Sequence, residues 1–146
     1  MRLVRFGGAM SLDGYIAGPH GEYDWIVMDP DIDFSALARQ FDTFLIGRKT
    51  FDVMKRMGNE ARSMGGITNI VLSRTLRQED YPRVRIESDA ARLVTELRTQ
   101  AGRDIAIFGG GIPLLPPPAG RAQLKLRGQK VYQKTGTIGL EYDILR

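Results

Sequence analysis

The chain has 146 residues, which suits one globular domain with a single hydrophobic core, and we expect residues 1–146 to form that domain. Hydrophobic residues make up 42% and charged residues 26%, values that exclude disordered and fibrous classes. The absence of cysteine excludes disulfides, zinc–thiolate sites and thiol nucleophiles, and the net charge of +4 suits an acidic small molecule better than nucleic acid, because the basic residues are scattered.

No segment approaches the roughly 20 consecutive apolar residues of a membrane-spanning helix. A chain without cysteine is also compatible with a reducing compartment. We therefore expect a cytoplasmic protein with no membrane partner.

Apolar patterning predicts alternating strands and helices through residue 108. Short apolar runs indicate strands covered on both faces, and apolar residues spaced by three or four indicate helices. In chain order the predicted elements are a strand over 3–10, a loop over 11–25, a helix over 34–41 with Asp31 or Asp33 as its N-cap, a strand over 43–46, a helix from Thr50, strands over 67–72 and 84–86, a helix capped by Asp89 and ended at Gly102, and a strand over 105–108.

The remainder of the chain changes character. Residues 124–133 and 138–145 alternate between apolar and polar side chains, with a Thr-Gly-Thr turn between them, which predicts an antiparallel hairpin. The whole pattern predicts an α/β domain around a mixed, mostly parallel sheet with helices on both faces. Ligands of such sheets bind at the carboxyl ends of the parallel strands.

The first candidate site segment, residues 47–50, lies between a predicted strand and a predicted helix. Gly47 allows close approach of a ligand to the backbone. Arg48, Lys49 and the Thr50 hydroxyl stand beside the unpaired N–H groups of the helix start, which is an arrangement that binds phosphate. The alternative is a strand-to-helix turn with solvated charges.

Two further segments follow predicted strands. Residues 73–75 supply two hydroxyls and a guanidinium, which suit a terminal phosphate such as the 2′-phosphate of NADP; the alternative is a polar turn. Residues 109–111 are three glycines whose backbone could wrap a pyrophosphate. We expect all three segments to meet at one edge of the sheet.

Five segments follow one another in the order AMSLDGYIAG (9–18), DW (24–25), GRKT (47–50), SRT (73–75) and FGGG (108–111). Together they resemble the dihydrofolate-reductase-like family, and more narrowly the reductase domain of bifunctional riboflavin-biosynthesis deaminase–reductases and its stand-alone bacterial relatives. The resemblance spans most of the chain and implies a three-layer sandwich with a C-terminal antiparallel hairpin. Its most specific part is SLDGYIA followed by GRKT.

The resemblance implies NADPH bound across the carboxyl edge of the sheet, where the protein orients the two rings and excludes water. Residues 47–50 and 109–111 would hold the pyrophosphate, 73–75 the 2′-phosphate, and 16–18 would flank the nicotinamide. The cofactor-binding residues implied are Ala9, Ile16, Gly18, Gly47, Arg48, Lys49, Thr50, Ser73, Arg74, Thr75, Gly109, Gly110 and Gly111.

A folate-type reductase also needs an acid that assists protonation of the ring being reduced. Of Asp29, Asp31 and Asp33, we take Asp31 as the catalytic candidate, because it stands where the family places its acid relative to the GR turn. Each of the three also suits an N-cap. The substrate-binding candidates are Asp13, which also suits an Asp-Gly turn, and Trp25, which also suits core packing. We expect no metal site.

The stretch FGGGIPLLPPPAG (108–120) departs from the family pattern. In relatives the glycine turn leads into a helix and a strand, whereas here it leads into prolines that cannot form a helix. We interpret this as a loss of ~30 residues, about one crossover unit. Such a loss would remove a helix dipole from the glycine turn, weaken cofactor binding and leave a strand edge open to another chain.

The leading interpretation is an NADPH-dependent reductase that transfers a hydride to a small pteridine- or pyrimidine-like heterocycle, as in folate or riboflavin biosynthesis, and acts as a homodimer. The alternative is a non-catalytic or cofactor-weakened reductase scaffold that mainly binds a nucleotide or associates with itself.

Overall fold

The computed structural model describes residues 1–56, 58, 66–108 and 123–145. The chain divides into two compact units, residues 1–9 with 35–110 and residues 10–34 with 111–146, and we describe each by itself. The elements in chain order are β1 (Val4–Phe6), α1 (Phe34–Ala38), β2 (Phe41–Gly47), α2 (Arg48–Arg56), β3 (Thr68–Leu72), the 3-10 turn η1 (Gln78–Asp80), β4 (Arg85–Glu87), α3 (Ala90–Thr99), β5 (Asp104–Phe108), β6 (Gln123–Tyr132) and β7 (Thr137–Leu145).

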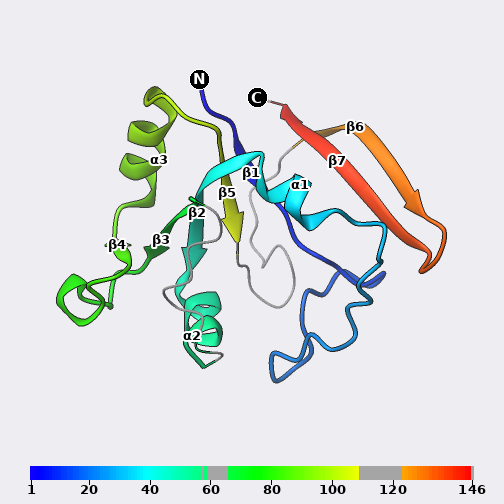
Figure 1. Cartoon of the computed structure of the whole chain (residues 1–146), viewed down its shortest axis with the longest axis horizontal. Helices are drawn as coiled ribbons and strands as arrows, with labels where there is room; N and C mark the ends of the chain where they lie inside the picture. Colours follow the sequence, from blue (N-terminus) through cyan, green and yellow to red (C-terminus); the bar gives the residue numbers. More distant parts are fainter. Residues whose placement is uncertain (57, 59–65, 109–122, 146) are drawn as a thin grey trace. The chain divides into compact units, whose positions relative to one another are not determined.

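The first unit is built on a five-stranded sheet in the order β1-β5-β2-β3-β4, with every neighbouring pair parallel (Figure 1). Gly47 of β2 lies opposite Leu72 of β3, and Ile46 lies opposite Phe108 of β5. The carboxyl ends of these three strands therefore meet at one edge, and the predicted parallel α/β sheet is confirmed.

Consecutive residues of the central strands face opposite sides of the sheet, as the period of two requires. Leu45 packs in one cluster with residues of α3, and Ile46 packs in a second cluster with Phe51 of α2. Helices thus cover both faces, as predicted. The buried members are Leu45, Ile70, Leu93, Leu97 and Ile105 in the first cluster and Ile46, Phe51, Val71 and Val84 in the second.

The predicted helix over 34–41 is wrong at its end. The backbone N–H of Gln40 donates to the carbonyl of Leu37 (3.1 Å), which closes α1 after Ala38. Phe41 instead opens β2 opposite Asp104 of β5, because strand pairing there outweighs the helical spacing of its side chain. The first strand is also shorter than predicted and ends at Phe6, immediately before two glycines.

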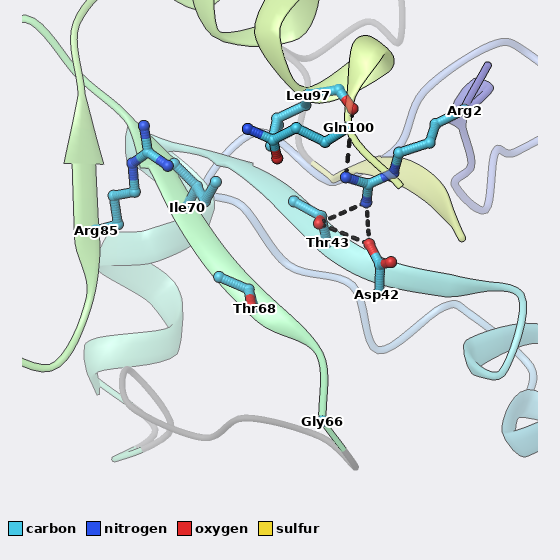
Figure 2. A pocket seen from close by; sticks show the side chains of 9 residues that line it. All are labelled: Arg2, Asp42, Thr43, Gly66, Thr68, Ile70, Arg85, Leu97 and Gln100. Carbon is cyan, nitrogen blue, oxygen red and sulfur yellow. Dashed lines mark hydrogen bonds and ion pairs between the residues drawn. The ribbon is translucent and has the colours of Figure 1, made fainter. Parts of the chain in front are cut away.

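Arg2 connects the amino ends of neighbouring strands through hydrogen bonds. Its side chain is buried, and its guanidinium donates to the Asp42 carboxylate, to Thr43 Oγ1 (2.8 Å) and to the carbonyl of Leu97 (3.4 Å; Figure 2). It also donates to the carbonyl of Arg103 (2.5 Å). These partners belong to β2, to α3 and to the residue before β5. One side chain therefore joins elements that are up to 101 residues apart in the chain.

Asp42 completes this buried network. Burial by itself would raise the pKa of the Asp42 carboxyl, but hydrogen bonds from Thr43 Oγ1 and the Arg103 backbone N–H, with the charge of Arg2, outweigh it and hold that pKa below its ordinary value. Asp42 is thus ionised at neutral pH and balances the buried positive charge of Arg2.

The second unit contains the predicted antiparallel hairpin, formed by β6 and β7. Leu126 pairs with Tyr142, and the next pair is Gly128 with Glu141, so Arg127 is an additional residue that forms a β-bulge. The hairpin prediction is confirmed, and the bulge is a feature that the alternating pattern did not reveal.

We predict that Gly102→Ala destabilises the first unit. Gly102 has a φ of +152°, and a Cβ there would lie 2.5 Å from Asp42 Oδ2 and 3.2 Å from Arg2 Cζ. The added methyl would displace the buried ion pair, so we expect a loss of about 1–3 kcal/mol of unfolding free energy, measured by urea denaturation.

Gly7→Ala is the matched control, because a Cβ at Gly7 meets nothing within 4 Å. It should change the unfolding free energy by less than about 0.5 kcal/mol. Equal urea midpoints for Gly102→Ala and the wild-type chain would contradict the prediction.

Candidate functional site

The first turn of α2 begins directly where β2 ends. Gly47 closes the strand and Arg48 opens the helix, two residues before the predicted start at Thr50. The first backbone N–H groups of a helix have no partner within it, and the helix dipole makes this end positive. The N–H groups of Arg48, Lys49 and Thr50 therefore stand at the carboxyl edge in an arrangement suited to an anion.

The second predicted segment forms a tight turn after β3. The backbone N–H of Ser73 donates to the carbonyl of Glu87 (2.9 Å), and Ser73 Oγ accepts from the N–H groups of Thr75 (3.2 Å) and Leu76 (3.1 Å). The Ser73 hydroxyl therefore stabilises the turn, which agrees with the alternative interpretation of residues 73–75 as a polar turn. This turn presents Arg74 and Thr75 to solvent.

A hydrogen bond joins these two segments. Arg48 Nη1 donates to Thr75 Oγ1 at 2.8 Å, while Arg48 Nε lies 3.6 Å from Asp52 Oδ2 one helical turn later. The structure thus brings together residues 47–50 and 73–75, which are separated by more than 20 residues in sequence, as the prediction of a shared edge requires.

Positive charge remains available at this edge. Lys49 and Arg74 are exposed, and in the part of the chain that the structure describes neither forms an ion pair. Glu87, the carboxylate at the end of β4, is already paired with Arg85 (2.7 Å) and Arg92 (3.1 Å). The two free cations are therefore not neutralised by it.

Two other candidate cofactor contacts belong to neighbouring strands. β5 ends at Phe108, opposite Ile46, and the glycines that follow, Gly109, Gly110 and Gly111, lie outside the described residues. Ala9 follows β1 by three residues in an exposed segment of the first unit. Their contacts with a cofactor stay predictions.

The motif SLDGYIAG forms consecutive tight turns in the second unit. The N–H of Gly14, whose φ is +90°, donates to the carbonyl of Ser11 (3.0 Å), and Ser11 Oγ donates to Asp13 Oδ1 (2.5 Å). Asp13 therefore acts as a turn residue here. The N–H of Gly18 donates to the carbonyl of Glu22 (2.8 Å) and closes the second turn.

The other candidates of this unit are Ile16, which is half-buried, and Trp25, which is exposed. They belong to the second unit, as do Asp13, Gly18 and Asp31. The contacts of these residues with a cofactor or substrate at the sheet edge therefore stay predictions.

The three candidate acids differ in their surroundings. Asp29 is buried and accepts hydrogen bonds from Thr135 Oγ1 (2.6 Å) and the Asp31 backbone N–H (2.9 Å). Asp31 is half exposed, and its carboxylate forms an ion pair with Lys134 Nζ (2.7 Å). These contacts attach the turn of the β6–β7 hairpin to the segment before α1. The catalytic role of Asp31 stays a prediction.

The pKa of Asp29 lies below its ordinary value. The hydrogen bond from Thr135 lowers it most; burial opposes this, and the Asp31 N–H and the charge of Lys134 add to the lowering. A carboxyl group whose pKa is lower in the folded state than in the unfolded state stabilises the folded state at pH values above its ordinary pKa. This stabilisation is lost as the pH falls through the lowered pKa.

We predict that Thr135→Val raises the pKa of Asp29, because the substitution removes the hydroxyl donor and keeps the shape of the side chain. The hairpin turn should also become less stable at neutral pH, where the lowered pKa contributes. Carboxyl-carbon NMR titration of Asp29 measures the first effect, and amide hydrogen exchange of residues 134–137 the second.

Thr95→Val is the control, because the Thr95 hydroxyl donates to the carbonyl of Ala91 within α3. It should leave the titration of Asp29 unchanged. A titration midpoint of Asp29 that is the same in Thr135→Val and wild type would show that the Thr135 hydrogen bond does not set it.

A cavity of about 340 Å³ lies elsewhere, at the amino ends of β2, β3 and β4 (Figure 2). Its charged lining is occupied: Arg2 is paired with Asp42, and Arg85 with Glu87. Since its charged groups already have partners and the predicted residues lie at the opposite strand ends, the carboxyl edge remains the candidate functional site.

Arg2 is a structurally important residue that was not predicted from the sequence. A usable signal was present: Asp42 interrupts the apolar run of β2, and a buried charge requires a partner of opposite sign. For the described ranges, no cluster of three His, Asp or Glu residues could hold a metal ion, and no helix is long and apolar enough to cross a membrane.

Comparisons with known proteins identify the family of the chain. The model of the RibD C-terminal domain family matches residues 2–113. The match therefore includes the whole five-stranded sheet and ends within the glycine- and proline-rich stretch.

Two relatives extend the comparison. The uncharacterized protein YyaP of Bacillus subtilis (strain 168) is 35% identical in an alignment 112 residues long that covers 70% of this chain and 60% of that protein. A crystal structure from Shewanella sp. PV-4, of a protein named for riboflavin biosynthesis, superposes with a TM-score of 0.78 at 21% identity and full coverage of both chains, which shows the shared fold. The chain therefore belongs to the RibD C-terminal domain family, a family of reductase-like domains.

Proposed function

We propose that this chain is a nicotinamide-dependent reductase that binds NADPH along the carboxyl edge of the sheet and reduces a small heterocycle of pteridine or pyrimidine type. Membership of a reductase-like family supports the reaction class. The observation that carries the proposal is the Arg48–Thr75 hydrogen bond (2.8 Å), because it joins the start of α2 to the turn after β3.

The donor groups at this edge suit a phosphorylated dinucleotide. The first turn of α2 offers N–H groups to a pyrophosphate, and the exposed guanidinium of Arg74 can contact a terminal phosphate with two parallel hydrogen bonds. Thr75 Oγ1 accepts from Arg48 and also lies 3.4 Å from Ser73 Oγ, so one of these two hydroxyls donates to the other and the second can donate to a ligand. Bound NADPH would supply the hydride; these residues would hold and orient it.

The Arg74→Gln substitution tests which phosphate is recognised. If Arg74 contacts the 2′-phosphate, the variant should bind NADPH about 10–100-fold more weakly, the value of one hydrogen-bonded charge contact, and should bind NADH almost as the wild-type chain does. Isothermal titration calorimetry with both dinucleotides measures the two affinities.

Arg83→Gln is the matched control. Arg83 is also an exposed arginine, but it precedes β4 and so lies at the amino ends of the strands. Its loss should leave both affinities unchanged. Equal weakening by the two substitutions would refute a specific contact at Arg74, and absence of any dinucleotide binding at millimolar concentration would refute the proposed function and favour a cofactor-weakened scaffold.

A further inference from the structure

Glu87 stands beside the turn of residues 73–75. It is the last residue of β4 and lies opposite Leu72, the last residue of β3. Its backbone carbonyl accepts a hydrogen bond from the N–H of Ser73 at 2.9 Å, so β4 is joined to the turn at the point where both strands end. The charge of the Glu87 side chain therefore acts on any anion that binds at this turn.

Two arginines occupy both oxygens of the Glu87 carboxylate. Arg85 donates to Oε1 from Nε (3.0 Å) and from Nη2 (2.7 Å), and Arg92 Nη2 donates to Oε2 at 3.1 Å. The side chain of Glu87 is 16% exposed, whereas those of Arg85 and Arg92 are 42% and 60% exposed. The carboxylate is thus the covered member of this cluster, and both of its oxygens already have donors.

Arg92 is held against Glu87 by α3, the helix that follows β4. Its backbone N–H donates to the N-cap side chain of Asp89 (3.0 Å), and its Nη1 lies 3.6 Å from Glu96 Oε2 one helical turn later. The N-cap bond uses the backbone of Arg92 and not its side chain. The side chain of Arg92 can therefore be replaced while the start of α3 keeps its cap.

A carboxylate at the end of a strand distinguishes the two nicotinamide dinucleotides. In dinucleotide-binding α/β folds an acidic residue accepts a hydrogen bond from the ribose 2′-hydroxyl of NAD, whereas an arginine accommodates the 2′-phosphate of NADP. An accessible Glu87 carboxylate would offer an acceptor to the 2′-hydroxyl and would repel a 2′-phosphate. In this structure the acceptor is occupied, while Arg74 of the neighbouring turn is exposed.

We propose that Arg85 and Arg92 are positioning residues that determine cofactor selectivity: by occupying Glu87 they remove both the acceptor for a 2′-hydroxyl and the repulsion of a 2′-phosphate. The ligand that this arrangement selects is an adenosine nucleotide with a phosphate on the ribose 2′-oxygen. The inference rests on the proposed function, since it assumes that a nucleotide binds at the carboxyl edge. It concerns the phosphate of that nucleotide and not the transfer of hydride.

Adenosine 2′,5′-bisphosphate and AMP are suitable probes, because they differ by the 2′-phosphate alone and contain no nicotinamide. Isothermal titration calorimetry of the full chain gives the ratio of their affinities. The wild-type chain should prefer the bisphosphate at least about tenfold, the value of one charge-assisted contact. Arg92→Gln should lower this ratio about three- to tenfold, because Glu87 Oε2 loses its donor. Its affinity for AMP should be unchanged or higher, a result that a general loss of structure would not give.

Arg83→Gln is the matched control for charge. It removes one exposed arginine, as Arg92→Gln does, but Arg83 precedes β4 at the amino ends of the strands. Because exposed charges at such a separation are screened by salt, the ratio should stay within about twofold of the wild-type value. An equal fall in Arg83→Gln and Arg92→Gln would overturn the proposal.

A double variant distinguishes occupation of Glu87 from direct contact of Arg92 with the phosphate. Glu87→Gln combined with Arg92→Gln removes the released carboxylate together with the arginine, so the ratio should return to within about twofold of the wild-type value. A ratio that stays low in the double variant would show that Arg92 itself binds the phosphate, and would overturn the proposal. A wild-type chain without preference for the bisphosphate would overturn it as well.

These measurements separate the inference from the proposed reductase activity. A preference for the bisphosphate that Arg92→Gln reduces, in a chain that does not bind NADPH, would support the role of the two arginines and refute the proposed function. Binding of NADPH by a chain whose ratio is the same with and without Arg92→Gln would support the proposed function and overturn the role of the arginines.

Discussion

The parallel alignment of β2 with β3 and β5 is the constraint on which the rest of the first unit depends. Because Gly47 lies opposite Leu72 and Ile46 opposite Phe108, three connections leave the sheet at the same edge. Segments that are far apart in sequence then become neighbours without any contribution from their own side chains. The Arg48–Thr75 hydrogen bond is a consequence of this alignment, since each of its residues stands within three positions of a strand end.

The two ends of the sheet are used differently. At the amino ends, the buried charge is matched: Arg2 is buried against Asp42 and Thr43, and Gly102 lies close enough to leave no room for a side chain. At the carboxyl ends, Lys49 and Arg74 remain exposed. Matched charge stabilises the fold, whereas unmatched charge at a helix start is free to interact with a ligand. This difference distinguishes the candidate edge from the rest of the sheet more clearly than the position of the cavity does.

The sequence predicted the order of strands and helices, the Asp89 N-cap and the hairpin, because these depend on local periodicity and capping chemistry. It could not predict that Phe41 leaves its helix, since the competing partner, Asp104, is over 60 residues away. The convergence of residues 47–50 and 73–75 followed from topology, and the structure agrees. The environments of Asp29 and Asp31 could not be predicted, because their partners, Thr135 and Lys134, lie about a hundred residues further along the chain.

The β-bulge in β6 has a consequence for how the hairpin tolerates changes of length. Arg127 and Gly128 together oppose one residue of β7, so β6 contains one residue more than regular alternation of side chains between the two faces would need. Removal of Arg127 would restore regular alternation and leave Leu124, Leu126 and Val131 on their present side. A deletion elsewhere in β6 would turn part of the strand over. The bulge is therefore the position at which β6 can become shorter by one residue, in evolution or by design, while each remaining side chain of the strand keeps its present face.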